Sequence, residues 1–109
     1  MRTITWSAAI GAALTAMALT SGPATGAPAA AVHINQFSFA PAVLTVPVGA
    51  TVKWTNDDEE THTVTAASGA FSSAGLGHEE GFSQTFARPG RYEYYCALHP
   101  HMRAEIVVQ

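Results

Sequence analysis

The chain has 109 residues, of which 48% are hydrophobic, and a formal net charge of −3 with the histidines neutral. From residue 27 onward the net charge is −4, which argues against nucleic acid as a partner. The single cysteine cannot form a disulfide within the chain.

The first 26 residues resemble an export signal. They begin with a basic residue, Arg2, continue with an apolar stretch and end in small residues, which is the order in a cleavable signal peptide. The alternative is an uncleaved membrane anchor. Threonine and serine residues interrupt the stretch, however, whereas a membrane span needs roughly 20 predominantly apolar residues. We therefore expect a periplasmic or secreted protein without stable membrane insertion after cleavage.

The rest of the chain is predicted to form one small domain. Residues 27–31 are rich in alanine and proline and are expected to be a flexible leader. Residues 32–109 alternate apolar and polar side chains with a period of two in almost every segment, as half-buried strands do. About 80 residues are enough for a single core.

The segment "VHINQFSFAP" opens this domain. Its apolar positions are Val32 and Ile34, then Phe37 and Phe39, so the phase of the alternation changes between the two pairs. This change predicts a bulge or bend at Asn35-Gln36.

Further strands follow, separated by Gly, Pro and Asn turns. The segment "VLTVPVGATVKWTN" is predicted to turn at Gly49-Ala50, and residues 66–81 form a long irregular loop. The positions expected to face inward are Leu44, Val46, Val48, Val52, Trp54, Val64, Tyr92, Tyr94, Cys96, Ala104, Ile106 and Val108. Short strands without a sustained helical period predict an all-β fold, an antiparallel sandwich or barrel.

A group of potential metal ligands lies near the C-terminus. Cys96 ends a predicted strand on its inward face, and His99 and Met102 follow three and six residues later. Two imidazoles, a thiolate and a weak thioether are the donors of copper electron-transfer sites. The best candidate for the second imidazole is His62, because it has the same strand parity as Val64.

Each of these residues also has a structural interpretation. A buried cysteine is often a small hydrophobic residue, and Met102 alone could fill the core. A structural zinc site of His62, Cys96 and His99 is another alternative, although zinc has little use for a thioether. The combined spacing at a strand end favours the copper site.

Three segments, "WTNDDEETHTVT", "FSQTFARPGRYEYYCALHPHM" and "AEIVV", resemble the cupredoxins, the small type 1 blue copper proteins. The Cys-x2-His-x2-Met spacing is similar to that of their amicyanin type. The resemblance implies a small antiparallel Greek-key β-sandwich. It also implies one copper ion that cycles between Cu(I) and Cu(II). The implied ligands are His62, Cys96, His99 and Met102.

The chain departs from the family pattern beside these residues. Many cupredoxins have an asparagine after the first histidine ligand, where its backbone and side chain support the thiolate and the ligand loop. Here the position is Thr63. Leu98 and Ala104 stand where a proline and a glycine are common. None of the three changes removes a ligand.

The expected function is one-electron transfer between redox partners, without catalysis, because four protein ligands leave no open metal position. The alternative is a copper-binding or copper-delivery module. Partners are expected to dock near Leu98, His99 and Pro100 on a monomeric protein. The acidic run 57–60 is either a solvated turn or an edge that attracts a basic partner. His33, His78 and His101 are expected at the surface.

Overall fold

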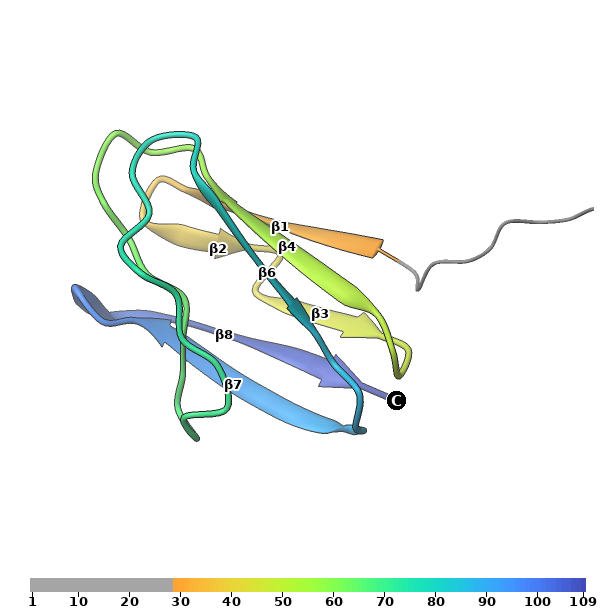
Figure 1. The fold of residues 1–109 in the computed structure, drawn as a ribbon. Helices are drawn as coiled ribbons and strands as arrows, with labels where there is room; N and C mark the ends of the chain where they lie inside the picture. Colours follow the sequence, from red (N-terminus) through yellow and green to blue (C-terminus); the bar gives the residue numbers. More distant parts are fainter. Residues whose placement is uncertain (1–28) are drawn as a thin grey trace, which may run out of the picture.

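The computed structural model describes residues 29–109, which form eight strands in two four-stranded sheets. One sheet has the order β2-β1-β4-β6 and the other β3-β8-β7-β5, and they lie as two layers (Figure 1). The strands are β1 Ala29–Asn35, β2 Ser38–Ala40, β3 Val43–Val46, β4 Thr51–Asn56, β5 Thr65–Ala66, β6 Gly81–Thr85, β7 Gly90–Cys96 and β8 His99–Val108. The all-β sandwich predicted from the sequence is confirmed.

Both sheets are mixed, whereas the sequence analysis expected antiparallel pairing. β1 runs parallel to β4, and β3 runs parallel to β8. The remaining pairs are antiparallel. Between the two strands of each parallel pair, the chain passes through the other sheet and then returns. The parallel pairs therefore join strands that are distant in the sequence.

The start of the domain differs from its prediction. Ala29 to Ala31 were expected in a flexible leader but belong to β1, where they pair with Thr51 to Lys53 of β4. The predicted signal peptide and residues 27–28 lie outside the described residues. Between Ala29 and Gln109 the structure contains no helix long and apolar enough to cross a membrane.

Alternation in the strands builds the core between the sheets. Val32 and Ile34 of β1 and Trp54 of β4 are fully buried, and Tyr94 of β7 packs against Trp54 with ring centroids 5.5 Å apart. The irregular loop 67–80 also contributes core side chains, Phe71 and Leu76. Inward parity alone could not identify these two, because no strand periodicity surrounds them.

Two apolar positions of the predicted alternation, Val48 and Phe37, do not face inward. Val48 is 48% exposed, because β3 ends at Val46 and the chain turns before β4. Phe37 is 43% exposed, because the predicted bend is a tight hairpin turn between β1 and β2 with positive φ at Gln36 and Phe37.

Two tyrosines of β7 differ in how their hydroxyls are paired. Tyr92 donates a hydrogen bond to the carbonyl of Arg88 at 2.8 Å. The hydroxyl of Tyr94 is buried and has no hydrogen-bond partner among the described residues. Burial raises the pKa of Tyr94 to about 12, and the Trp54 indole opposes this rise with a smaller effect.

We expect Tyr94→Phe to leave the free energy of unfolding at neutral pH unchanged or to raise it by up to about 1 kcal/mol, because an unpaired buried hydroxyl is unfavourable. The matched change Tyr92→Phe should lower it by about 0.5–1.5 kcal/mol through loss of the bond to Arg88. Urea unfolding measures both, and the reverse ranking would contradict the prediction.

The raised pKa of Tyr94 also predicts how the free energy of unfolding changes at alkaline pH. An unfolded tyrosine ionises near pH 10, whereas folded Tyr94 holds its proton to about 12. The stability contributed by neutral Tyr94 is therefore fully present below about pH 10 and is lost as pH rises toward about 12. Tyr94→Phe should flatten the decline of the free energy of unfolding in this window.

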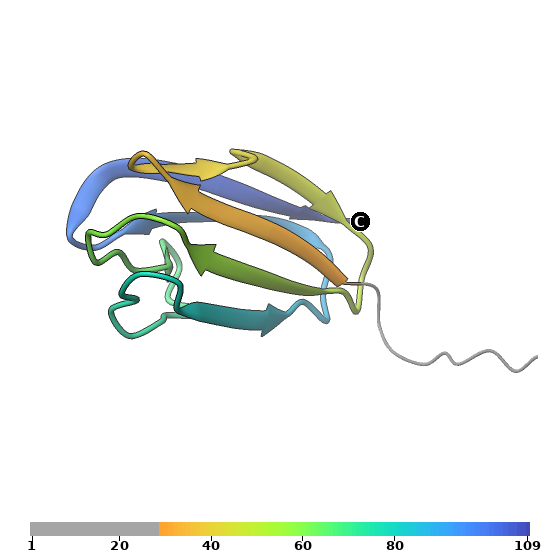
Figure 2. The same ribbon diagram turned by 90° about the horizontal axis from the view of Figure 1, so that it is seen from above.

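Four turns and loops between strands lie at the same end of the sandwich. The β1–β2 turn, the loop after β4, the loop before β6 and the β7–β8 turn all lie at the end opposite to the C-terminus (Figures 1 and 2). His62, Cys96 and His99 are carried by these connections and the strand ends beside them.

Candidate metal centre

Asn56, the last residue of β4, organises the loop that carries His62. Its side chain is fully buried, and its amide donates hydrogen bonds to the carbonyls of Glu60 and Leu76, each at 2.8 Å. Its carbonyl oxygen accepts from the backbone N–H of Asp58 at 2.9 Å. The polar run 57–60 is thereby folded into a fixed loop.

His62 is held at the backbone as well. Its N–H donates to the carbonyl of Leu76 at 3.1 Å, and its carbonyl accepts from the Leu76 N–H at 2.7 Å. The imidazole is fully buried. The long loop before β6 therefore fixes the place of this histidine.

The β7–β8 hairpin positions the other predicted ligands. Cys96 pairs with His99, whereas the preceding residue Tyr95 pairs with Arg103, so the register shifts between the two pairs. Three residues of β8, including Met102, are inserted at this irregularity. β8 already begins at His99, so His99 and Met102 both belong to a strand. A bulge of this kind redirects side chains next to a site.

Three of the predicted ligands meet at one point. His62, Cys96 and His99 each offer a ligand atom within 4.8 Å of the others, and the Cys96 sulfur lies 3.7 Å from Nδ1 of both histidines. Cys96 is fully buried and His99 half-buried. The side chain of Met102 is also buried, 3% exposed, in the first half of β8.

The donor set fits copper. A thiolate and two imidazoles around one point, with a thioether in the same hairpin, match the preference of copper for soft and borderline ligands. The arrangement also defines which histidine nitrogens face the metal position, because both Nδ1 atoms lie near the sulfur.

Asp58 orients His62 from the opposite side. Its Oδ2 lies 2.9 Å from Nε2 of His62. A carboxylate there accepts the Nε2 proton, which leaves Nδ1 unprotonated toward Cys96. Burial acts to raise the pKa of Asp58, but the N–H groups of Phe37 and Gln36 and the contact with His62 outweigh it, so the pKa is lowered.

Thr63 makes the contacts that the family resemblance assigns to an asparagine. Its backbone N–H donates to the Cys96 sulfur at 3.4 Å. Its Oγ1 accepts from the N–H of Ala97 at 2.7 Å and lies 3.0 Å from Oγ1 of Thr65. The hydroxyl therefore ties the β7–β8 turn to the loop of His62.

We expect Thr63→Val to lower the free energy of unfolding by about 1 kcal/mol, because the N–H of Ala97 loses its acceptor while the backbone bond to Cys96 stays. Thr63→Ser keeps a hydroxyl and should recover most of the loss. Urea unfolding of both variants without metal tests this. Equal losses in the two variants would show that the hydroxyl has no such role.

The remaining histidines are exposed, as expected. His33 contacts Asp57 at 2.9 Å, and the ring of His101 lies 6.3 Å from that of His99. His78 donates a hydrogen bond to the carbonyl of Asp58. This bond, together with the nearby carboxylates of Glu59 and Glu79, raises the pKa of His78. Within residues 29–109, no other group of three ligand side chains meets as His62, Cys96 and His99 do.

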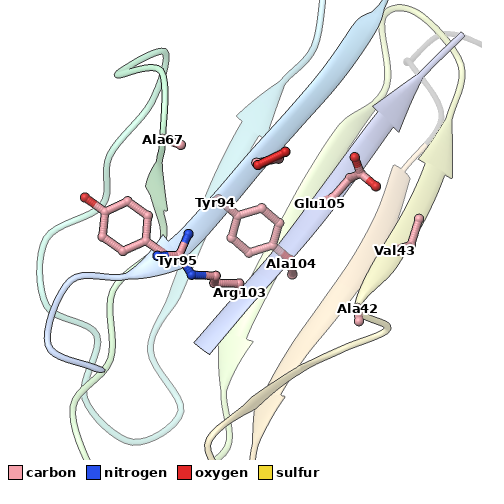
Figure 3. Close-up of a pocket in the computed structure, with 9 residues that line it drawn as sticks. Ala42, Val43, Ala67, Tyr94, Tyr95, Arg103, Ala104 and Glu105 are labelled. Atoms are coloured by element: carbon pink, nitrogen blue, oxygen red, sulfur yellow. The ribbon is translucent and has the colours of Figure 1, made fainter. Parts of the chain in front are cut away.

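A pocket of the described residues lies apart from this centre. It is lined by residues of β7 and β8 together with Val43 and Ala67, and none of the predicted ligands borders it (Figure 3). Charged and aromatic side chains, Arg103, Glu105 and Tyr95, line the same hollow.

Three residues near the candidate metal centre were not predicted from the sequence to support it. Asn56 and Asp58 were not identified as supporting residues, and Phe37 was predicted only as an apolar position of a half-buried strand. The ring of Phe37 instead packs against both histidine ligand candidates. The only local signal was the position of Asp58 four residues before His62 in a polar run.

Comparison with known sequences gives a consistent result. The chain matches the family described as "Cupredoxin-like domain" over residues 7–108. Amicyanin from Paracoccus denitrificans is 35% identical over 83 residues, which cover 72% of this chain and 63% of that protein. Amicyanin-alpha from Methylorubrum extorquens is 30% identical, and the match covers 100% of both chains. The chain thus spans less than two thirds of the first relative.

Solved structures with similar folds include two that this chain covers almost completely and one that it covers only in part. A purple cupredoxin from Nitrosopumilus maritimus has a TM-score of 0.68 and 31% identity, covering 73% of this chain and 99% of that one. A reduced Cu(I) form of an amicyanin variant has a TM-score of 0.70 and 33% identity, covering 80% and 86%. A copper-containing nitrite reductase from Thermus scotoductus has a TM-score of 0.73 and 31% identity, covering 85% and 25%.

Proposed function

This chain belongs to the cupredoxin-like family, and we propose that it is a type 1 copper protein that carries single electrons between redox partners. The family membership confirms the resemblance stated from the sequence and, at the level of the family, the copper cofactor. The observation that carries the proposal is the convergence of the Cys96 sulfur with Nδ1 of His62 and His99 inside a rigid sandwich.

We assign the ligands as His62, Cys96, His99 and Met102. Copper supplies the one-electron couple when bound. The chain would supply two imidazole nitrogens, a thiolate sulfur and a thioether sulfur from fixed backbone positions, so little rearrangement is needed between the two oxidation states. The backbone N–H of Thr63 donates to the sulfur and stabilises its negative charge, while Asp58 holds the proton of His62 on Nε2.

The proposed role is not enzymatic, because four protein ligands leave no open position for a substrate. The similar nitrite reductase is an enzyme, but this chain covers only 25% of it. The electron is expected to pass through the half-buried edge of His99. Exposed Leu98, with 56% of its surface accessible, and Pro100 flank this histidine and form the proposed docking face for redox partners.

The proposed setting is the periplasm or the outside of the cell, with the protein as a monomer. The support is the signal-like pattern of residues 1–26 and the similarity to amicyanins. In an oxidising compartment, a buried cysteine that binds metal is protected from forming disulfides with other molecules.

The deciding experiment is voltammetry combined with visible and EPR spectra of the copper-loaded protein. An electron carrier will show intense thiolate-to-copper colour with Cu(II) and a reversible one-electron wave. A copper-delivery module with the same ligands will bind Cu(I), stay colourless with Cu(II) and lose its metal readily to a chelator. The second pattern would reject the carrier role.

A further inference from the structure

The β1–β2 turn has a backbone conformation that requires support. Gln36 and Phe37 have φ angles of +55° and +59°. Residues other than glycine adopt this region rarely, and a bulky aromatic residue there is an outlier. Such a conformation persists where surrounding groups hold it, and it often occurs at functional sites.

The support comes from Asp58, which is distant in the sequence. Oδ1 accepts the N–H of Gln36 at 2.7 Å, and Oδ2 accepts the N–H of Phe37 at 2.9 Å. The same Oδ2 accepts from Nε2 of His62 at 2.9 Å. The Asp58 side chain is only 12% exposed. One carboxylate therefore fixes both the turn and a proposed copper ligand.

The turn places the Phe37 ring on the ligand pair. Its centroid lies 5.0 Å from the His62 ring and 5.1 Å from the His99 ring, with interplanar angles of 89° and 87°. The two imidazoles are 5.2 Å apart. Edge contacts at these distances are favourable. The three rings thus pack pairwise at the end of the sandwich.

Core packing does not explain this position. Phe37 remains 43% exposed, and phenylalanine is more stable when its surface leaves water. The strained turn brings an apolar ring out to the surface, where it covers the two histidines instead of filling the core.

We propose that Phe37, held by Asp58, is a positioning residue that fixes the orientation of His99 and limits access of water to the copper position. The inference rests on the proposed electron-carrier function. His62 is held directly by Asp58 and by its backbone pair with Leu76. His99 lies at the start of β8 beside an irregular register, so the Phe37 ring packed edge to face against it restricts its rotation.

This role predicts the sign of a change in reduction potential. The Cu(II) site with one thiolate carries one positive charge more than the Cu(I) site. Water stabilises the more highly charged state, and an apolar cover favours the less charged state. Removal of the Phe37 ring will therefore lower the midpoint potential and make His99 more mobile.

The first test uses the protein without metal, so it does not depend on copper chemistry. Phe37→Ala should remove the contribution of the Phe37 ring to the ring-current shifts of the His62 and His99 ring protons in NMR spectra. Asp58→Asn should reduce the shift at His99 as well, because it releases the turn. In the Phe37→Ala background, Asp58→Asn should add no further change at His99.

The second test uses the copper-loaded protein. Phe37→Ala should lower the midpoint potential and slow electron self-exchange about 10- to 100-fold, by analogy with the loss of metal affinity or activity when residues that orient metal ligands are replaced. Phe37→Leu keeps apolar cover without the flat ring and should give a smaller change. The matched control is Val48→Ala, which removes an apolar side chain of similar exposure, 48%, from the β3–β4 turn.

The outcomes separate the two proposals. If the unchanged protein lacks reversible copper redox chemistry, the electron-carrier function fails, whatever Phe37 does. If the unchanged protein is active and Phe37→Ala matches Val48→Ala in midpoint potential and in self-exchange rate, the positioning role is wrong, whatever the His99 shifts show. A lower potential with loss of the His99 shifts in Phe37→Ala supports it.

Discussion

Replacement of Cys96 by serine will abolish the intense visible colour of the Cu(II)-loaded protein. The colour of a type 1 site requires charge transfer from a thiolate to copper, and a serine hydroxyl is a harder donor that stays protonated near neutral pH. Cys96 is the only cysteine of the chain. Its sulfur lies 3.7 Å from Nδ1 of His62 and 3.7 Å from Nδ1 of His99. Visible and EPR spectra of the Cu(II)-loaded variant measure the loss.

His101→Ala is the matched control for this prediction. His101 lies in the same stretch, between His99 and Met102, but its side chain is exposed and was predicted to lie at the surface. The variant should keep the colour and the EPR signal. If Cys96→Ser stays blue, or if His101→Ala loses its colour, the ligand assignment is wrong.

Replacement of Asn56 by alanine will lower the free energy of unfolding by about 3 kcal/mol. The side chain makes three hydrogen bonds to backbone groups, those of Glu60, Leu76 and Asp58. Each such bond contributes about 1 kcal/mol, and buried groups left without a partner add to the loss. Urea unfolding without metal measures the change.

Asn35→Ala is the control for this change. Asn35 ends β1 with an exposed side chain, and its replacement should alter stability by less than about 0.5 kcal/mol. Since Asn56 shapes the loop that carries His62, Asn56→Ala should also weaken copper binding. Equal stability of the two variants would show that Asn56 does not organise the loop.

The sequence predicted those features that depend on local pattern. Period-two alternation located the buried positions of β1, β4 and β7, since each strand has one face in the core. The inward phase of Cys96 and the spacing to His99 and Met102 likewise depend only on neighbouring residues. The second histidine followed from the parity of His62 with Val64, and the structure brings its ring to the same sulfur.

The supporting residues could not be predicted in this way. Phe37 and Asp58 are 21 positions apart, and no periodic pattern relates them. Alternation alone assigns Phe37 to a buried face, because a left-handed turn without glycine has no clear sequence signal. The strand pairing of Ala29 to Ala31 depends on β4, which lies 22 residues later in the chain.

The position of the two buried ligand candidates relative to each other also affects how the chain folds. His62 and Cys96 are 34 positions apart: His62 lies in the loop that leaves β4 of one sheet, and Cys96 ends β7 of the other. Closing a loop of this length is entropically unfavourable for a flexible chain. A metal ion that bridges both side chains binds the native state more tightly than the unfolded state, so it stabilises the closed arrangement by mass action. The single cysteine can thus cross-link the two sheets of the domain through a metal, as a disulfide does in small exported proteins.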